Sequence, residues 1–149
     1  MESKAQNVLG GEAIQARLRV ARVARLATVD AKCRPHLVAV CFVYDGRAFY
    51  TALDLKPKRV APAQLARVRH IRERPDVALL VDEYHEDWAN LWYILIRGKA
   101  TLLEEPGREQ RQAHSLLKSK YPQYAAGLLP APALLIRILP THVTCWGKF

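Results

Sequence analysis

The spacing of hydrophobic and polar positions along the first third of the chain predicts one helix followed by three strands. Ile14, Leu18 and Ala21 recur at the i, i+4, i+7 spacing of one helix face, which predicts a helix over residues 12–24. Apolar and β-branched runs then predict three strands, at residues 26–29, 35–44 and 47–52.

Turn residues and prolines mark the ends of the remaining elements. Asp45 and Gly46, between the second and third strands, are typical of the type I′ turn of a β-hairpin. A helix is expected over residues 62–74, because Pro62 can open it and Pro75 disfavours helical geometry in the residue before it. The same reasoning predicts strands at residues 77–81, 91–103 and 133–146, and a helix after Pro106.

This order of elements predicts a mainly β fold with peripheral α-helices. Six strands, joined mostly without helices, favour a small antiparallel barrel over the βαβ alternation of a parallel sheet. The chain contains no internal repeat, so we expect residues 1–149 to form a single domain, with residues 1–11 as a flexible N-terminal arm. Gly98 interrupts the strand expected at residues 91–103, which indicates a bulge or the close approach of a ligand or of another backbone.

Composition adds a concentration of positive charge to this picture. Half of the 149 residues are hydrophobic, which favours a folded chain, and the formal net charge is +9. Between Lys56 and Arg74 there are seven cations and one anion. Within this window, Lys56, Lys58 and Arg59 lie between the predicted strand that contains Thr51 and the predicted helix that follows. Cationic donors beside a helix N-terminus suit a phosphate group, whereas the later cations equally fit a solvated helix face.

Several function classes are not supported by the sequence. The five histidines fall in five different predicted elements without zinc-ligand spacing, and no HExxH or GxSxG motif is present, so we expect no metal site and assign no catalytic nucleophile. Three cysteines without a CxxC pair favour reduced thiols, and no apolar run is long enough for a membrane helix. We therefore expect a cytoplasmic protein that does not span a membrane.

Four segments, in this order along the chain, resemble a known family. They read TALDLKPKR at residues 51–59, RPDVALLVD at 74–82, DWANLWY at 87–93 and RGKA at 97–100. The sequence resembles the flavin- and deazaflavin-binding oxidoreductases related to pyridoxamine 5′-phosphate oxidase, and most of all the small members thought to use the deazaflavin F420. The resemblance implies a six-stranded antiparallel split β-barrel that forms a homodimer with two cofactor sites at the subunit interface.

The resemblance also assigns residues to the cofactor. It places the cofactor phosphate on four side chains: Thr51, Lys56, Lys58 and Arg59. It lays the ring system against the strand around Pro35, His36, Leu37 and Val38. Trp88, and with it Trp146, would approach the ring or substrate from the partner subunit, whereas a tryptophan such as Trp92 more often fills a core or an interface. Only Gly147, Lys148 and Phe149 follow Trp146, where the oxidase that names the family has an arginine-containing segment, so vitamin B6 oxidation is not expected.

The expected function is an oxidoreductase that uses bound F420, or FMN as the alternative, for hydride transfer with a small organic substrate. The cofactor carries the redox chemistry, which agrees with the absence of a catalytic dyad. Two other functions remain open: a non-catalytic protein that binds or senses FMN or heme, and a basic module that binds nucleic acid through residues 56–74. The second is disfavoured because no aromatic residues are interleaved with these cations. The substrate itself is not readable from the sequence.

Overall fold

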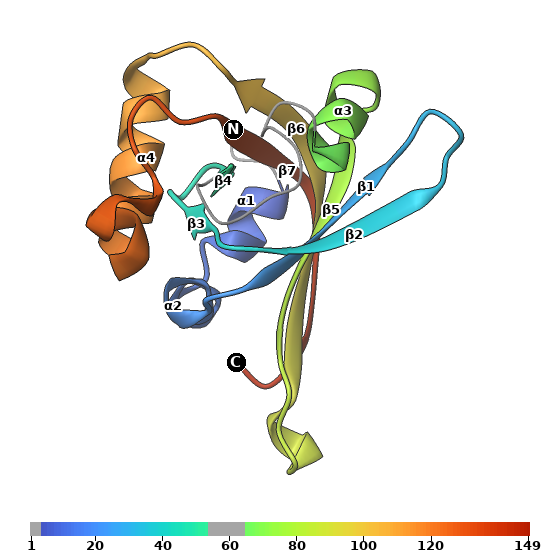
Figure 1. Cartoon of the computed structure of the whole chain (residues 1–149). Helices are drawn as coiled ribbons and strands as arrows, with labels where there is room; N and C mark the ends of the chain where they lie inside the picture. Colours follow the sequence, from blue (N-terminus) through green and yellow to red (C-terminus); the bar gives the residue numbers. More distant parts are fainter. Residues whose placement is uncertain (1–3, 54–64) are drawn as a thin grey trace.

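A strongly curled antiparallel sheet organises the chain in the computed structural model, which describes residues 4–53 and 65–149 (Figure 1). In this described part, seven strands are hydrogen-bonded in the order β2-β1-β5-β6-β7-β4-β3. The strands are β1 (Ala24–Val29), β2 (Pro35–Val40), β3 (Val43–Tyr44), β4 (Phe49–Ala52), β5 (Asp76–Glu83), β6 (Trp92–Leu103) and β7 (Leu135–Gly147). The expectation of a mainly β, antiparallel half-barrel with peripheral helices is therefore confirmed.

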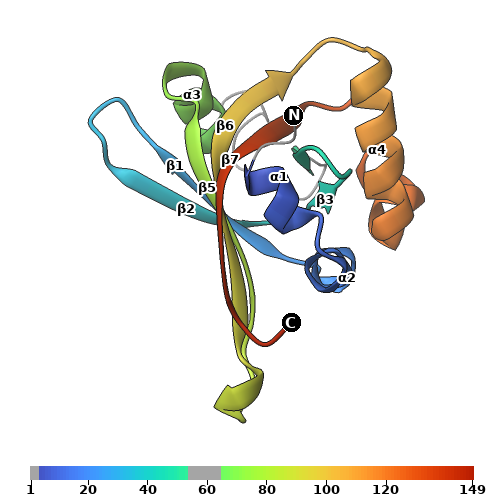
Figure 2. The same ribbon diagram turned by 180° about the vertical axis from the view of Figure 1, so that it is seen from behind.

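Helices surround the sheet on two sides. They are α1 (Lys4–Leu9), α2 (Glu12–Val20), α3 (Ala66–Glu73) and α4 (Arg108–Lys120), with a 3₁₀ turn η2 (Trp88–Asn90) and a π-type turn η3 (Tyr124–Leu128). Both views show α2 and α4 beside β3 on one side, and α3 with the β1–β2 hairpin on the other (Figures 1 and 2). No helix in the described ranges combines the length and the apolar character needed to cross a bilayer.

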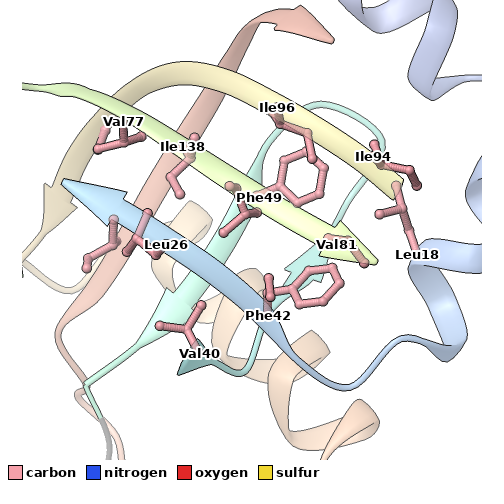
Figure 3. Close-up of a cluster of buried hydrophobic side chains, with 14 of the residues drawn as sticks. Leu18, Leu26, Val40, Phe42, Phe49, Val77, Val81, Ile94, Ile96 and Ile138 are labelled. Carbon is pink, nitrogen blue, oxygen red and sulfur yellow. The ribbon is translucent and has the colours of Figure 1, made fainter. Parts of the chain in front are cut away.

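The inner face of the curled sheet carries the hydrophobic core. Strand alternation produces this face, since Val77, Leu79 and Val81 of β5 are buried while Ala78 and Leu80 between them are half-buried on the outer face. Figure 3 shows the inward side chains of several strands meeting one another, with Leu18 of α2 at the side of the cluster. Burial of this face supplies most of the driving force for folding.

The strand predicted at residues 35–44 is divided in two, so six expected strands become seven. At the break, the backbone N–H and carbonyl groups of the buried Phe42 are both hydrogen-bonded to the side chain of Tyr121, the residue that follows α4. Its N–H donates to the Tyr121 hydroxyl at 2.9 Å, and that hydroxyl lies 2.9 Å from the Phe42 carbonyl oxygen and 3.0 Å from the Arg22 carbonyl oxygen. One tyrosine thus replaces the strand neighbour that Phe42 would otherwise need.

The predicted type I′ turn at Asp45 and Gly46 is wrong. Gly46 has φ of +95°, but Asp45 does not adopt a positive φ. The loop instead has four residues, because the Asp45 carboxylate accepts hydrogen bonds from the backbone N–H groups of Arg47 and Ala48, both at 2.8 Å. Aspartate favours this side-chain turn, and it delays the start of the next strand from residue 47 to Phe49.

Both explanations offered for Gly98 are confirmed. The pairing of β6 with β7 shifts register between Arg97 and Gly98, as a β-bulge does. A Cβ atom at Gly98 would also run into the backbone oxygen of Leu139 on β7. The two strands therefore approach each other closely only because this position has no side chain.

The N-terminal segment differs from both expectations made for it. Residues 4–9 of the predicted flexible arm form α1, whose Leu9 is fully buried and which packs against β7. The helix predicted to reach residue 24 ends at Val20, because Ala21 is extended and β1 already begins at Ala24. The helix predicted from Pro62 is described as Ala66–Glu73, and its expected start lies outside the described residues.

Candidate functional site

The strand predicted to carry the cofactor ring presents its residues on two faces. On β2, Pro35 and Leu37 point to the outer face of the sheet, and Leu37 is 65% exposed. His36 and Val38 point inward, where Val38 packs against the core cluster. A planar ring in contact with this strand would therefore meet one pair of side chains or the strand's outer edge, which no described strand pairs on the side away from β1.

The inward residue His36 belongs to a small polar group at one end of the core. Thr28 is its direct cross-strand partner on β1, and α3 brings His70 against both. The Thr28 hydroxyl and His70 Nδ1 are hydrogen-bonded at 2.9 Å, and the rings of His36 and His70 lie edge to face with centroids 5.4 Å apart. Residues from β1, β2 and α3 thus meet at this end of the core.

One imidazole nitrogen of this polar group lacks a hydrogen bond within the described residues. His36 Nδ1 is buried and has no hydrogen-bond partner among the residues that the structure describes. Burial, followed by the charges of His70 and Arg67, lowers the pKa of His36 below its usual value. The ring is therefore neutral at neutral pH and keeps a nitrogen available for a ligand group, since buried polar atoms are rarely left unpaired.

A groove on the outer face of the sheet begins at the same strand. Its volume is about 390 Å³, which falls in the range of small-molecule sites. Pro35 lines it from β2, and the main part of its wall comes from β1, β5 and the bulged segment of β6. The wall is largely apolar, with polar side chains contributed by Asp76, Arg97, Thr141 and His142. The bulge at Gly98 thus shapes this groove as well as the strand pairing.

Farther along the outer face, aromatic and aliphatic side chains remain uncovered. Tyr93 and Trp146 are register partners on β6 and β7, and their rings stack with centroids 5.8 Å apart. Trp146 is 53% exposed, and Leu80 and Leu95 are half-buried on the neighbouring strands. Together with Leu37 they make the outer face more apolar than a solvent-facing sheet surface usually is.

Trp88 stands far from the predicted ring site of its own chain. It begins the turn η2, which Asp87 caps by accepting a hydrogen bond from the backbone N–H of Ala89 at 3.0 Å, and its side chain is 72% exposed. In Figure 1 this turn lies at the far end of the β5–β6 hairpin, away from the β1–β2 hairpin. Trp92, by contrast, is 2% exposed in the core, as expected for a structural tryptophan.

The predicted phosphate ligands are only partly visible. Lys56, Lys58 and Arg59 lie outside the described residues. Thr51 is 3% exposed in β4, where it pairs with Ile136 of β7. Leu53, the last described residue before the gap, shares a core cluster with Val68 of α3. Among the described residues, no hydrogen bond joins Thr51 to β2, the strand predicted to hold the ring. That Thr51 and β2 bind the same cofactor stays a prediction.

The family model described as pyridoxamine 5′-phosphate oxidase matches residues 11–147. The chain belongs to this family. None of the curated proteins matches it in sequence.

Solved structures show that the fold of this pyridoxamine 5′-phosphate oxidase family member recurs widely. The heme storage protein HutZ from Vibrio cholerae superimposes with a TM-score of 0.72 at 17% identity, over 91% of this chain and 92% of that one. A conserved hypothetical protein from Mycobacterium tuberculosis gives a TM-score of 0.71 at 21% identity, over 99% and 90%. An F420 reductase gives 0.63 at 20% identity, over 90% and 98%. At these identities the likeness establishes the fold and no more.

Sequence reasoning missed the partners of His36. Thr28 was predictable in principle, because the length of the β1–β2 hairpin decides which residue lies opposite His36. His70 carried no such signal, since the packing of α3 brings it to His36. Arg97 and His142 reach the groove through the pairing of β6 with β7. No group of three or more metal-binding side chains occurs in residues 4–53 and 65–149.

Proposed function

We propose that this protein is an oxidoreductase that binds a flavin-type cofactor, F420 in preference to FMN, and transfers a hydride between it and a small organic substrate. The observation that carries the proposal is the family match over residues 11–147. The sequence segments at residues 51–59 and 87–93, which resemble the F420-using members, support the choice of cofactor. The anionic tail of F420 also suits a chain with a net charge of +9.

The described residues fit such a cofactor. The outer-face groove has the size and the apolar wall that a planar ring requires, and Pro35 borders it from β2. On the inner face of the same strand, His36 Nδ1 has no hydrogen-bond partner among the described residues. Lys56, Lys58 and Arg59, with Thr51, are proposed to hold the phosphate. When bound, the cofactor supplies the two-electron chemistry, while these residues bind it, orient it and exclude water.

A homodimer is part of the proposal. The uncovered outer face with Leu37, Tyr93 and Trp146 supports it, because a second copy seated there would bury this apolar surface. Trp88 is 72% exposed in the turn η2 at the far end of the β5–β6 hairpin, where it could reach a partner's groove. Light scattering after gel filtration should therefore give twice the mass of the chain.

The cofactor assignment is tested by titrating the purified protein with FMN and F420 side by side, following absorbance and fluorescence. F420 should bind in the micromolar range or tighter, and more tightly than FMN. Replacing Lys56 and Arg59 together by alanine should weaken binding at least about tenfold, since each removes a charge-assisted hydrogen bond. Lys118→Ala, on the exposed face of α4, is the matched control for charge and should leave binding within about twofold. Equal affinities for the double variant and the wild type would refute the phosphate assignment.

Heme binding without catalysis is a second candidate, favoured by one observation. His36 has a neutral imidazole whose Nδ1 lacks a partner in the part of the chain that the structure describes, and imidazole is a common axial ligand of heme iron. A hemin titration under the same conditions separates the two candidates. A Soret band that is lost in His36→Ala, with no response to F420 or FMN, would replace the oxidoreductase proposal. A salt-dependent shift with DNA and no response to any of the three cofactors would favour the nucleic-acid module instead.

A further inference from the structure

A cleft between α2, β3 and α4 lies apart from the proposed cofactor site. Its volume is about 450 Å³, well within the range of small-molecule sites. Both views place these three elements on one side of the sheet and α3 with the β1–β2 hairpin on the other (Figures 1 and 2). The cleft therefore shares no wall with the groove beside Pro35.

The charged side chains that line this cleft all have the same sign. They are Arg19, Arg22 and Lys120, and no carboxylate lies among the described residues that line the cleft. Within the described ranges, 4–53 and 65–149, none of the three forms an ion pair. Three uncompensated cations around a concave surface create a local positive potential, because a cleft with low-dielectric walls focuses the field.

Two of these cations are held in place by the backbone rather than by acids. Arg22 donates a hydrogen bond to the backbone oxygen of Lys120, and the Lys120 ammonium donates one to the backbone oxygen of Leu18 at 3.0 Å. Lys120 Nζ also lies 4.0 Å from the centroid of the Phe42 ring. Burial and the nearby charge of Arg22 lower the pKa of Lys120 to about 8. An anion in the cleft would relieve this repulsion.

The rest of the lining is apolar or neutral. Leu18 and Val43 are buried beneath the cleft and Leu116, on α4, is 41% exposed beside it. Ser119 adds a hydroxyl group. A purely inorganic anion would leave this apolar wall in water, whereas an organic anion with a ring or chain would cover it.

From the three cations, the missing carboxylates and the apolar floor, we propose that this cleft binds a small organic anion that carries an apolar body. The site is independent of the redox cofactor and goes beyond the proposed function. Its ligand class is an aryl or alkyl carboxylate or sulfonate, in which the acidic group faces Arg19, Arg22 and Lys120 and the apolar part covers Leu18 and Leu116.

The probe for this site is naphthalene-1-sulfonate, titrated into ¹⁵N-labelled protein and followed by NMR. Saturable shifts should concentrate on amides of α2, β3 and the last turn of α4. Arg19→Gln and Lys120→Gln should each weaken binding about fivefold or more, and Lys118→Gln, on the other face of α4, should leave it within about twofold. Arg19 is exposed, so its variant tests the proposal even if Lys120→Gln impairs folding.

Two further arms separate charge recognition from general stickiness. The neutral naphthalene-1-sulfonamide should bind at least about fivefold more weakly than the sulfonate to the wild type, and equally to wild type and Arg19→Gln. Affinity for the sulfonate should fall as the pH rises above 8 in the wild type but not in Lys120→Gln. The groups that face Lys120 are Arg19, Arg22, Cys41, Tyr44 and Tyr121. The proposal is overturned if no saturable shifts occur, if they map to the outer sheet face, or if Arg19→Gln and Lys118→Gln behave alike.

Discussion

Replacing Tyr121 with phenylalanine removes one hydroxyl group from the break between β2 and β3 and changes nothing else in the side chain. That hydroxyl accepts a hydrogen bond from the Phe42 N–H and is shared as donor between the carbonyl oxygens of Phe42 and Arg22, all at 2.9 to 3.0 Å. Burial raises the pKa of Tyr121 to about 12, so the hydroxyl is neutral at neutral pH and its loss alters no charge.

The expected loss of unfolding free energy depends on whether each group that loses the Tyr121 hydroxyl can bind water instead. Phe42 is fully buried, so its N–H has no access to water and loses its hydrogen bond outright, which costs about 1–3 kcal/mol. The Arg22 carbonyl belongs to an exposed residue and can be hydrated instead. The Phe42 carbonyl adds up to about 1 kcal/mol. We therefore expect Tyr121→Phe to lower the free energy of unfolding by about 2–3 kcal/mol.

Urea unfolding, followed by circular dichroism at fixed protein concentration, measures this loss. Tyr84→Phe is the matched control, because Tyr84 is 64% exposed and its hydroxyl lies 3.4 Å from the Glu86 carboxylate, so its loss should stay within about 0.5 kcal/mol. If Tyr121→Phe also costs under about 0.5 kcal/mol with an unchanged urea dependence, the hydroxyl does not hold the break, and the split of the predicted strand needs another cause.

Three further outcomes are expected. Gly98→Ala should destabilise the protein by about 2–4 kcal/mol in thermal or urea unfolding, because the new methyl group meets the backbone of Leu139; a neutral result would contradict the close approach. Lys120→Met should remove one source of the pH dependence of the unfolding free energy. Because its pKa is lowered to about 8, Lys120 binds fewer protons in the folded than in the unfolded state. The unfolding free energy of the wild type should therefore rise relative to that of the variant between pH 8 and about 10, by up to about 2 kcal/mol after allowance for solvent screening. Leu37→Asp should shift the proposed dimer toward monomer in light scattering, while Lys32→Asp, on the exposed β1–β2 turn, should not.

Most of the strands were predictable because their signal is local. On β6, alternating polar and apolar residues reported the two faces of the sheet directly, and Gly98 marked its own irregularity. The break after β2 left no such mark, since the group that causes it, Tyr121, lies 79 positions away from Phe42. The turn at Asp45 was predicted wrongly for a related reason. Hydrogen bonds from the backbone to the Asp45 carboxylate override the preference of the Asp45–Gly46 pair for a type I′ turn.

The candidate site divides in the same way. His36 and Leu37 could be placed on a strand, but the pleat that separates them onto opposite faces emerges only once the strand is paired. His70 reaches His36 because α3 packs across β1 and β6, a tertiary arrangement with no trace in residue spacing. The same holds for the groove, whose wall combines β1, β5, β6 and β7.

Two concentrations of cations contribute to the net charge of +9, and we propose a separate function for each. Sequence alone located one concentration, residues 56–74, because those cations lie close together along the chain. The second consists of Arg19, Arg22 and Lys120, which a window along the chain cannot detect because about a hundred residues separate α2 from the end of α4. If the two are separate anion sites, their variants must dissociate in both directions. Lys56→Ala with Arg59→Ala should weaken F420 and spare naphthalene-1-sulfonate, whereas Arg19→Gln should do the reverse. Loss of both ligands in either variant would show that a single diffuse potential, and not two built sites, accounts for the charge.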